Sequence, residues 1–380
     1  MTVTIREHRP GEDVSAFIRA GHVVFEGDPA WVPPLDFEIK ERLSPKKNPF
    51  FNRAEAMLFT AWKGDRLVGR CSASIDREHL RVWKDDTGFF GFFDTIDDLE
   101  VARALLDAAE AWLRARGMKR MWGPFSLYAN EEVGLLIEGH EAPPMLSMAH
   151  SRTYQAALCD ALGLAKEKDL LAYRWDSSLP FSKRALKAWE DVKAMPEVRL
   201  RSVDPSRMAE ELQVVMDIYN DAWKGKWAMV PTLPDEIAKI TQDMKLVLDP
   251  DIAFIAEVDG KPAGMCIMIP NLNEAIHDLG GSLFPTGVFK LLWRTKMRHP
   301  ATARLMLLGI NGHVRANIKR YGGLSTAMYV EVAKRGTAKG YAWGELSWTR
   351  EDDAPVNLGI KMMGGVVYKR YRVYTKSLVA

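Results

Sequence analysis

The 380-residue sequence has few cysteines, almost no excess of charge and no long hydrophobic run. Cys71, Cys159 and Cys266 are far apart and form no Cys-x-x-Cys pair, so we expect neither a disulfide scaffold nor a metal site. The net charge of +2 gives no global nucleic-acid signal. No run approaches the ~18 apolar residues of a membrane-spanning helix, and the N-terminus lacks the apolar core of a signal peptide. These absences predict a cytoplasmic protein that binds no nucleic acid.

One order of secondary-structure elements occurs twice along the chain. Each half is expected to hold a strand, a helix, a hairpin (56–75 and 252–270), a strand, a helix, a strand, a helix and a last strand. Single cores stop growing near ~250–300 residues, and a repeated order favours duplication. We therefore predict an α/β fold with domains over 1–178 and 197–380, joined by a linker helix within 179–196.

The second half contains a candidate anion site. An apolar strand (304–311) leads into a basic turn (313–326) and then a helix (327–341). Free N–H groups at a helix N-terminus attract anions such as a pyrophosphate, and Gly322 and Gly323 allow close backbone approach. The basic side chains of the turn are those of Arg315, Lys319 and Arg320. The alternative is an ordinary strand–helix crossover with glycines in its loop.

The repeated order resembles the GCN5-related N-acyltransferase (GNAT) fold. In that fold a mixed, mostly antiparallel sheet is flanked by helices and splays where two neighbouring strands part, and the pantetheine arm of coenzyme A lies in the gap. Both halves also end in a short helix, a glycine and strands rich in tyrosine and arginine, in 160–175 and 361–376. The resemblance implies two tandem GNAT-like domains.

Longer strings carry a narrower resemblance. They are NPFFNRAEAMLFTAW (48–62), GFFGFFDTIDD (88–98), GPFSLYANEEVGLLIEG (123–139), YNDAWKGKWAMVP (219–231) and GELSWTRED (344–352). These strings are similar to the tandem acyltransferase family that includes bacterial ceramide synthases. The resemblance implies acyl-CoA as co-substrate, a long-chain amine as acceptor and no permanently bound cofactor.

The resemblance also indicates which half binds acyl-CoA. GNAT proteins bind pyrophosphate at a Gln/Arg-x-x-Gly-x-Gly/Ala turn, where the first half has the acidic, glycine-free segment 94–102. Acidic groups there would repel a pyrophosphate, so the first half is expected to be degenerate as a CoA site and to serve the acceptor. The second half matches this turn except at its last position, which is a leucine. The expected CoA contacts are Arg315, Lys319, Arg320, Gly322, Gly323, Leu324, Ser325 and Asn357.

The reaction requires a base, because an amine must lose a proton to attack a thioester. Glu131 and Glu132 are candidates in a loop of the first half, although such pairs are commonly solvated loop charges. His150 is another candidate, which could equally be structural. Glu345 and Glu351 lie on and just after the strand beside the gap, where Glu345 could also be a strand-edge charge.

The leaving thiolate needs a proton, which GNAT enzymes usually take from a tyrosine near the last helix. Ile360 and Cys159 occupy that position in the two halves. Tyr368 or a water is therefore expected to supply the proton, unless the thiolate leaves unassisted.

Segment 283–299 combines apolar residues with basic ones, namely Phe284, Phe289, Leu291, Leu292 and Trp293 with Lys290, Arg294, Lys296, Arg298 and His299. A basic amphipathic helix suits a membrane surface, and its alternative is an extra helix packed on the sheet. Together with the resemblance, it favours an acyl-CoA N-acyltransferase for a sphingoid base, peripheral on the inner face of the cell membrane. An N-acetyltransferase for a soluble amine or peptide and a non-catalytic acyl-CoA or lipid-binding protein are the alternatives.

Overall fold

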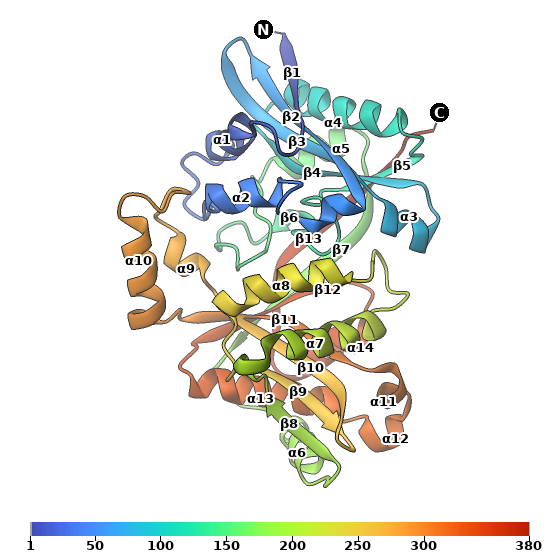
Figure 1. The fold of residues 1–380 in the computed structure, drawn as a ribbon, viewed down its shortest axis with the longest axis vertical. Helices are drawn as coiled ribbons and strands as arrows, with labels where there is room; N and C mark the ends of the chain where they lie inside the picture. The colour runs from blue at the N-terminus through green and yellow to red at the C-terminus, as the bar shows by residue number, and fades with distance from the viewer. Residues whose placement is uncertain (1, 380) are drawn as a thin grey trace. The chain divides into compact units, whose positions relative to one another are not determined.

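The computed structural model describes residues 2–379, and the chain forms two compact units (Figure 1). Unit 1 runs to residue 170 and includes 276–291 and the segment from residue 369, whereas unit 2 comprises 171–275 and 292–368. Two long strands, β7 (Ala165–Asp176) and β13 (Val366–Ser377), each begin in one unit and end in the other. The compact units are therefore discontinuous in sequence, unlike the continuous ranges that we predicted.

In unit 1 a mixed sheet has the strand order β1-β2-β3-β4-β5-β13, with β6 also paired to β13. Its pairs are antiparallel except for β4 and β5. The strands are β1 (Val3–His8), β2 (Ala54–Lys63), β3 (Arg66–Asp76), β4 (Thr87–Thr95), β5 (Arg120–Gly123) and β6 (Leu135–Glu138). The helices are α1 (Ser15–Val24), α2 (Asp36–Arg42), η1 (Pro49–Asn52), α3 (Arg77–Trp83), α4 (Leu99–Arg114) and α5 (Gln155–Ala161).

Helix α4 shows how the sequence builds this unit. Its apolar residues recur three or four positions apart, so that one face lies against the sheet. The Asp98 carboxylate caps its first turn by accepting from the backbone N–H groups of Glu100 and Val101. Gly117 follows the end of the helix in the left-handed conformation that glycine tolerates, with φ +80°. The apolar pattern of this segment thus forms a helix that ends at Arg114.

In unit 2 the second half of β7 begins a sheet of order β7-β12-β11-β10-β9-β8. Strands β11 and β12 are parallel, and the pairs β10–β11, β9–β10 and β8–β9 are antiparallel. The strands are β8 (Val198–Ser202), β9 (Ala253–Val258), β10 (Lys261–Pro270), β11 (Thr302–Ile310) and β12 (Trp343–Arg350). The helices are α6 (Lys183–Lys193), η2 (Pro205–Arg207), α7 (Met208–Ala222), α8 (Pro234–Val247), α9 (Asn273–Ile276), α10 (Gly287–Trp293), η3 (Arg294–Arg298), α11 (Gly312–Ala316), α12 (Ile318–Tyr321), α13 (Leu324–Ala338) and α14 (Ala354–Met362).

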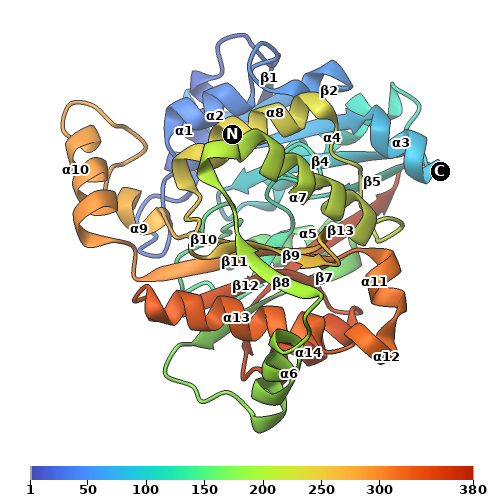
Figure 2. The ribbon, with the colours of Figure 1, turned by 60° about the horizontal axis from the view of Figure 1, so that its bottom comes forward.

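Helices cover both faces of the unit 2 sheet, with α7 on one face and α13 on the other (Figure 2). Side chains of α13 such as Met328, Val330 and Val332 are buried in a core that also contains residues of β9 and β10. Helix α6 packs on α13, where Ala188 and Val192 face Gly323. This second covering layer explains why the α13 sequence is apolar around most of its surface.

Two predicted segments differ in detail. The basic turn over 313–326 contains the short helices α11 and α12, and α13 begins at Leu324, three residues earlier than expected. Segment 283–299 forms the short helix α10 and then the π-helix η3, in place of one continuous helix. From residue 2 to residue 379, no helix is both long and apolar enough to cross a membrane.

Candidate active site

The parallel strands β11 and β12 part within unit 2. The two strands are paired only from Thr302 opposite Trp343 to Leu305 opposite Leu346. Both strands then continue, β11 to Ile310 and β12 to Arg350. The gap between them opens toward the N-terminus of α13, because the chain passes from the end of β11 through α11 and α12 into that helix.

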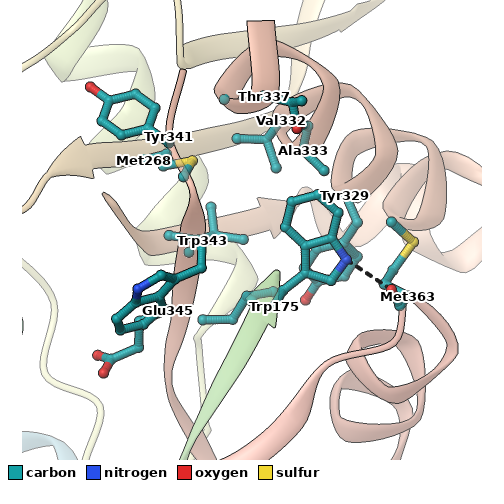
Figure 3. A pocket seen from close by; sticks show the side chains of 14 residues that line it. Trp175, Met268, Tyr329, Val332, Ala333, Thr337, Tyr341, Trp343, Glu345 and Met363 are labelled. Carbon is teal, nitrogen blue, oxygen red and sulfur yellow. Dashed lines mark hydrogen bonds between the residues drawn. The ribbon is translucent and has the colours of Figure 1, made fainter. Parts of the chain in front are cut away.

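An apolar cavity lies at the closed end of this gap (Figure 3). It encloses about 460 Å³ of space free of protein atoms, its open mouth included. Strands β7, β10, β11 and β12 line it together with α13 and Met363. The indole N–H of Trp175 donates to the Met363 carbonyl at 2.9 Å, which fixes one wall of the cavity.

A buried polar cluster lies beside the cavity on β12. The hydroxyl groups of Tyr368 and Ser347 donate hydrogen bonds to the two carboxylate oxygens of Glu345, which is fully buried. Figure 3 shows the Glu345 carboxylate at the margin of the cavity, directed away from the side chains of α13. Glu345 and Ser347 are two residues apart on one strand, so their side chains project from the same face. The carboxylate is therefore held in one position with both oxygens hydrogen-bonded.

Arg304 of β11 completes this cluster from the neighbouring strand. Its Nε donates to Ser347 Oγ at 2.9 Å and lies 3.9 Å from Glu345 Oε1, and its Nη2 donates to the Ser347 carbonyl at 3.3 Å. Sequence reasoning missed Arg304 and Ser347. A signal was present, since Arg304 is a lone charged residue in an otherwise apolar strand and a buried charge requires a partner.

Glu351 and Asn357 lie just beyond this cluster. The Asn357 amide group donates to the carbonyls of Arg350 at 2.8 Å and Glu351 at 3.3 Å, and its Oδ1 accepts from the Thr349 hydroxyl at 2.7 Å. These contacts tie α14 to the end of β12. Asn357, expected to contact CoA, thus has its side-chain amide engaged by the protein.

The expected pyrophosphate residues surround the N-terminus of α13. Gly323 is the N-cap residue, and no side chain caps the first turn, which also lacks acidic residues. Ser325, an expected CoA contact, lies inside the helix, and Leu324 is buried in the core. Gly322 and Gly323 both have negative φ, and a Cβ on Gly323 would face Ala188 and Val192 of α6 at 3.7 Å. The first turn of α13 therefore keeps backbone N–H groups without a side-chain acceptor.

The basic residues of this turn differ in how they are held. Arg320 donates to Glu197 at 2.8 Å from its Nε, and Arg315 donates to the Ala222 carbonyl at 3.2 Å. Lys319 is exposed. An anion at this turn would therefore meet Lys319 directly, whereas the two guanidinium groups already have protein partners.

The corresponding gap of unit 1 is closed by the chain itself. Strands β4 and β5 are paired from Thr87 to Phe89, and then the Phe125 N–H donates to the Phe90 carbonyl at 2.8 Å. A Cβ on Gly91 would lie only 1.6 Å from the Phe125 carbonyl oxygen, so glycine is required for this close approach. The gap between β4 and β5 is therefore occupied by backbone.

Glu131 and Glu132 of unit 1 both pair with Arg42 of α2. The Arg42 Nε lies 3.1 Å from Glu131 Oε2, and its Nη1 lies 3.0 Å from Glu132 Oε1. Burial lowers the pKa of Arg42, but the two carboxylates outweigh it, so that the pKa is raised. The geometry is that of a charge cluster that fastens a loop to a helix.

His150 forms a buried pair with Asp28. Its side chain is 3% exposed, and its Nε2 donates to Asp28 Oδ2 at 3.1 Å. Its Nδ1 has no hydrogen-bond partner within residues 2–379. Burial lowers the pKa of His150, although the hydrogen bond to Asp28 opposes this shift.

This pair predicts a pH dependence of stability. Because the pKa of His150 is lower in the folded state, the unfolded chain takes up the proton first, and stability falls as pH drops below about 6.5. The slope from one such group is at most about 1.4 kcal/mol per pH unit. Urea unfolding between pH 7 and 5 should show a shallower pH dependence for His150→Gln than for the native protein. An equal slope in both proteins would contradict the assignment.

No family model matches the sequence. The chain is 38% identical over 368 residues to protein YghO of Escherichia coli K12, covering 96% of this chain and 93% of that protein. It is 39% identical over 355 residues to the bacterial ceramide synthase of Caulobacter vibrioides, covering 92% of this chain and 91% of that protein.

Solved structures confirm the predicted fold class. A tandem GNAT protein from the clavulanic acid biosynthesis pathway matches with a TM-score of 0.59 and 13% identity, covering 100% of this chain and 99% of that one. A GCN5-related N-acetyltransferase from Sphaerobacter thermophilus matches with a TM-score of 0.55 and 13% identity, covering 100% and 96%. The chain therefore belongs to the tandem GNAT family of N-acyltransferases that includes the bacterial ceramide synthase.

Proposed function

We propose that this N-acyltransferase joins a long-chain acyl group from CoA to the amine of a sphingoid base, such as 3-oxosphinganine or sphinganine, and forms a ceramide-type amide. The observation that carries the proposal is the buried Glu345 cluster beside an apolar cavity, where β11 and β12 part. The 39% identity to a protein named bacterial ceramide synthase supports the acceptor class.

The cluster can move the protons that the reaction requires. The amine nitrogen attacks the thioester carbonyl, a C–N bond forms, the C–S bond breaks and CoA leaves as the thiolate. Glu345 accepts the amine proton. Tyr368 donates its hydroxyl proton to the thiolate and regains one from Glu345 through their shared hydrogen bond. Arg304 and Ser347 hold the carboxylate in place during this exchange.

The contrast between the units supports a donor in unit 2. The first turn of α13 carries no acidic residue and no side-chain cap, so its dipole and N–H groups favour a pyrophosphate. At the corresponding helix of unit 1, Asp98 caps α4 and pairs with Lys63. Backbone also fills the gap between β4 and β5. We assign unit 1 to the acceptor side, with Glu131, Glu132 and His150 in supporting positions.

Segment 283–299 supports an acceptor in a lipid bilayer. Five of the 13 exposed large hydrophobic side chains of the described residues lie in this segment, including Phe284 at 82% and Phe289 at 75% exposure. Leu291 instead packs against the cluster of Val32, Leu35 and Ile276. The segment thus anchors one side in the protein and presents another apolar side to solvent. We propose that this side meets the membrane surface, which makes the enzyme peripheral.

The test is product formation by the purified protein. With palmitoyl-CoA and sphinganine, we expect the amide by mass spectrometry together with an equal amount of free CoA thiol, and neither above background with heat-inactivated protein. No amide, together with acetylation of a soluble amine, would instead favour the N-acetyltransferase. Acyl-CoA binding without turnover of either acceptor would favour the binding protein.

A further inference from the structure

The cavity of unit 2 continues the gap between β11 and β12 into the protein. Its β12 residues, 343–346, are the residues still paired to β11. Its α13 residues run from Tyr329 to Thr337, which is about 12 Å at the helical rise of 1.5 Å per residue. Helix α13 is antiparallel to the two strands, because it returns the chain from the end of β11 to the start of β12. The cavity therefore extends from the point where the two strands part toward the closed end.

The lining of this cavity matches an alkyl chain. Tyr329, Val332 and Ala333 line it from α13 (Figure 3). Leu305 and Leu346 line it from the sheet. Glu345 also lines the cavity, but its carboxylate points away from the side chains of α13.

Two glycines and a methionine shape the closed end. An ideal Cβ on Gly336 of α13 would lie 3.5 Å from Met268 Cε, and one on Gly344 of β12 would lie 3.4 Å from the same atom. Both are ordinary contact distances, so alanine would fit at either position and a larger side chain would enter the cavity. Glycine lowers the stability of a helix interior relative to alanine. At Gly336, however, the missing side chain leaves space at the closed end of the cavity.

We propose that this cavity binds the acyl chain of the donor and that Gly336, Gly344 and Met268 set the longest chain it accepts. The inference rests on the proposed function in taking a long-chain acyl-CoA as donor. Each methylene moved from water into such a lining strengthens binding roughly fourfold. Affinity should therefore rise with chain length until the chain reaches Met268, and then level off.

Binding of saturated acyl-CoAs from acetyl to stearoyl, measured by calorimetry without any amine, tests the proposal. In Gly336→Leu, the added side chain displaces terminal methylenes, so affinity should level off at a shorter chain and palmitoyl-CoA should bind at least about tenfold more weakly. Met268→Ala should shift the limit in the opposite direction, toward longer chains. Ala338→Leu is the matched control, since it adds the same group on the exposed side of α13.

The outcomes separate this subsite from the proposed acceptor. An equal loss for all chain lengths in Gly336→Leu, or the same profile as in Ala338→Leu, would overturn the subsite. The subsite would also be overturned if affinity in Met268→Ala levelled off at the same chain length as in the native protein, or at a shorter one. If the binding profiles shift as expected but no amide forms with a sphingoid base, the subsite stands and the proposed acceptor fails.

Discussion

Replacing Glu345 by glutamine is expected to lower kcat about 10²–10⁴-fold, the usual contribution of a general base. Glutamine keeps the size of the side chain but cannot take the amine proton. It also interrupts the return of that proton to Tyr368, whose hydroxyl now donates to the Glu345 carboxylate. Binding of acyl-CoA should change little, since the carboxylate points away from the cavity.

The control is Glu351→Gln, one residue past the end of β12 and outside the described hydrogen bonds of the Glu345 carboxylate. It should retain activity within about threefold if Glu345 is the base. Thermal unfolding checks that both variants fold, because disturbing a buried hydrogen bond costs about 1–3 kcal/mol. Equal activities of Glu345→Gln and the native protein, or a loss in Glu351→Gln alone, would move the base away from Glu345.

The double substitution Leu292→Glu and Trp293→Glu should weaken binding to anionic vesicles at least about tenfold. Both side chains are about half exposed on α10, at 49% and 52%, and burying a large apolar side chain stabilises by about 1.5–3 kcal/mol. The new carboxylates also repel anionic lipid. Nearby cations attract anionic lipid, and one of them is Arg298, whose guanidinium carbon lies 5.4 Å from the centre of the Trp293 ring. Turnover of a bilayer-embedded acceptor should fall, and turnover of a detergent-dispersed acceptor should not.

Val82→Glu is the matched control for this experiment, because Val82 is an exposed hydrophobic residue on α3, outside segment 283–299. It should leave vesicle binding unchanged. Raised salt should weaken the binding of the native protein, since exposed charges are screened. Equal losses of turnover in both acceptor formats would show that the segment stabilises the protein and does not contact the membrane.

The order of elements, the duplication and the family could all be predicted from the sequence. Local hydrogen bonding fixes periods of two and 3.6 residues, so patterns such as the apolar face of α4 reveal strands and helices. The long strings that resemble the tandem acyltransferases predicted the family, which 38–39% identity to two relatives confirms. Glu345 was identified because it lies on the strand beside the expected gap.

Only the tertiary structure decided which residues surround Glu345 and how the gaps differ. Arg304 and Tyr368 meet Glu345 from other strands, and the register that brings them together depends on pairing between distant parts of the chain. The same holds for Arg42 beside Glu131 and for the Phe125 backbone over Gly91. The cavity also arises only from packing, because its wall combines residues of β7, β10, β11 and β12 with residues of α13. Sequence periodicity specifies the face on which a side chain lies, and folding specifies its neighbours.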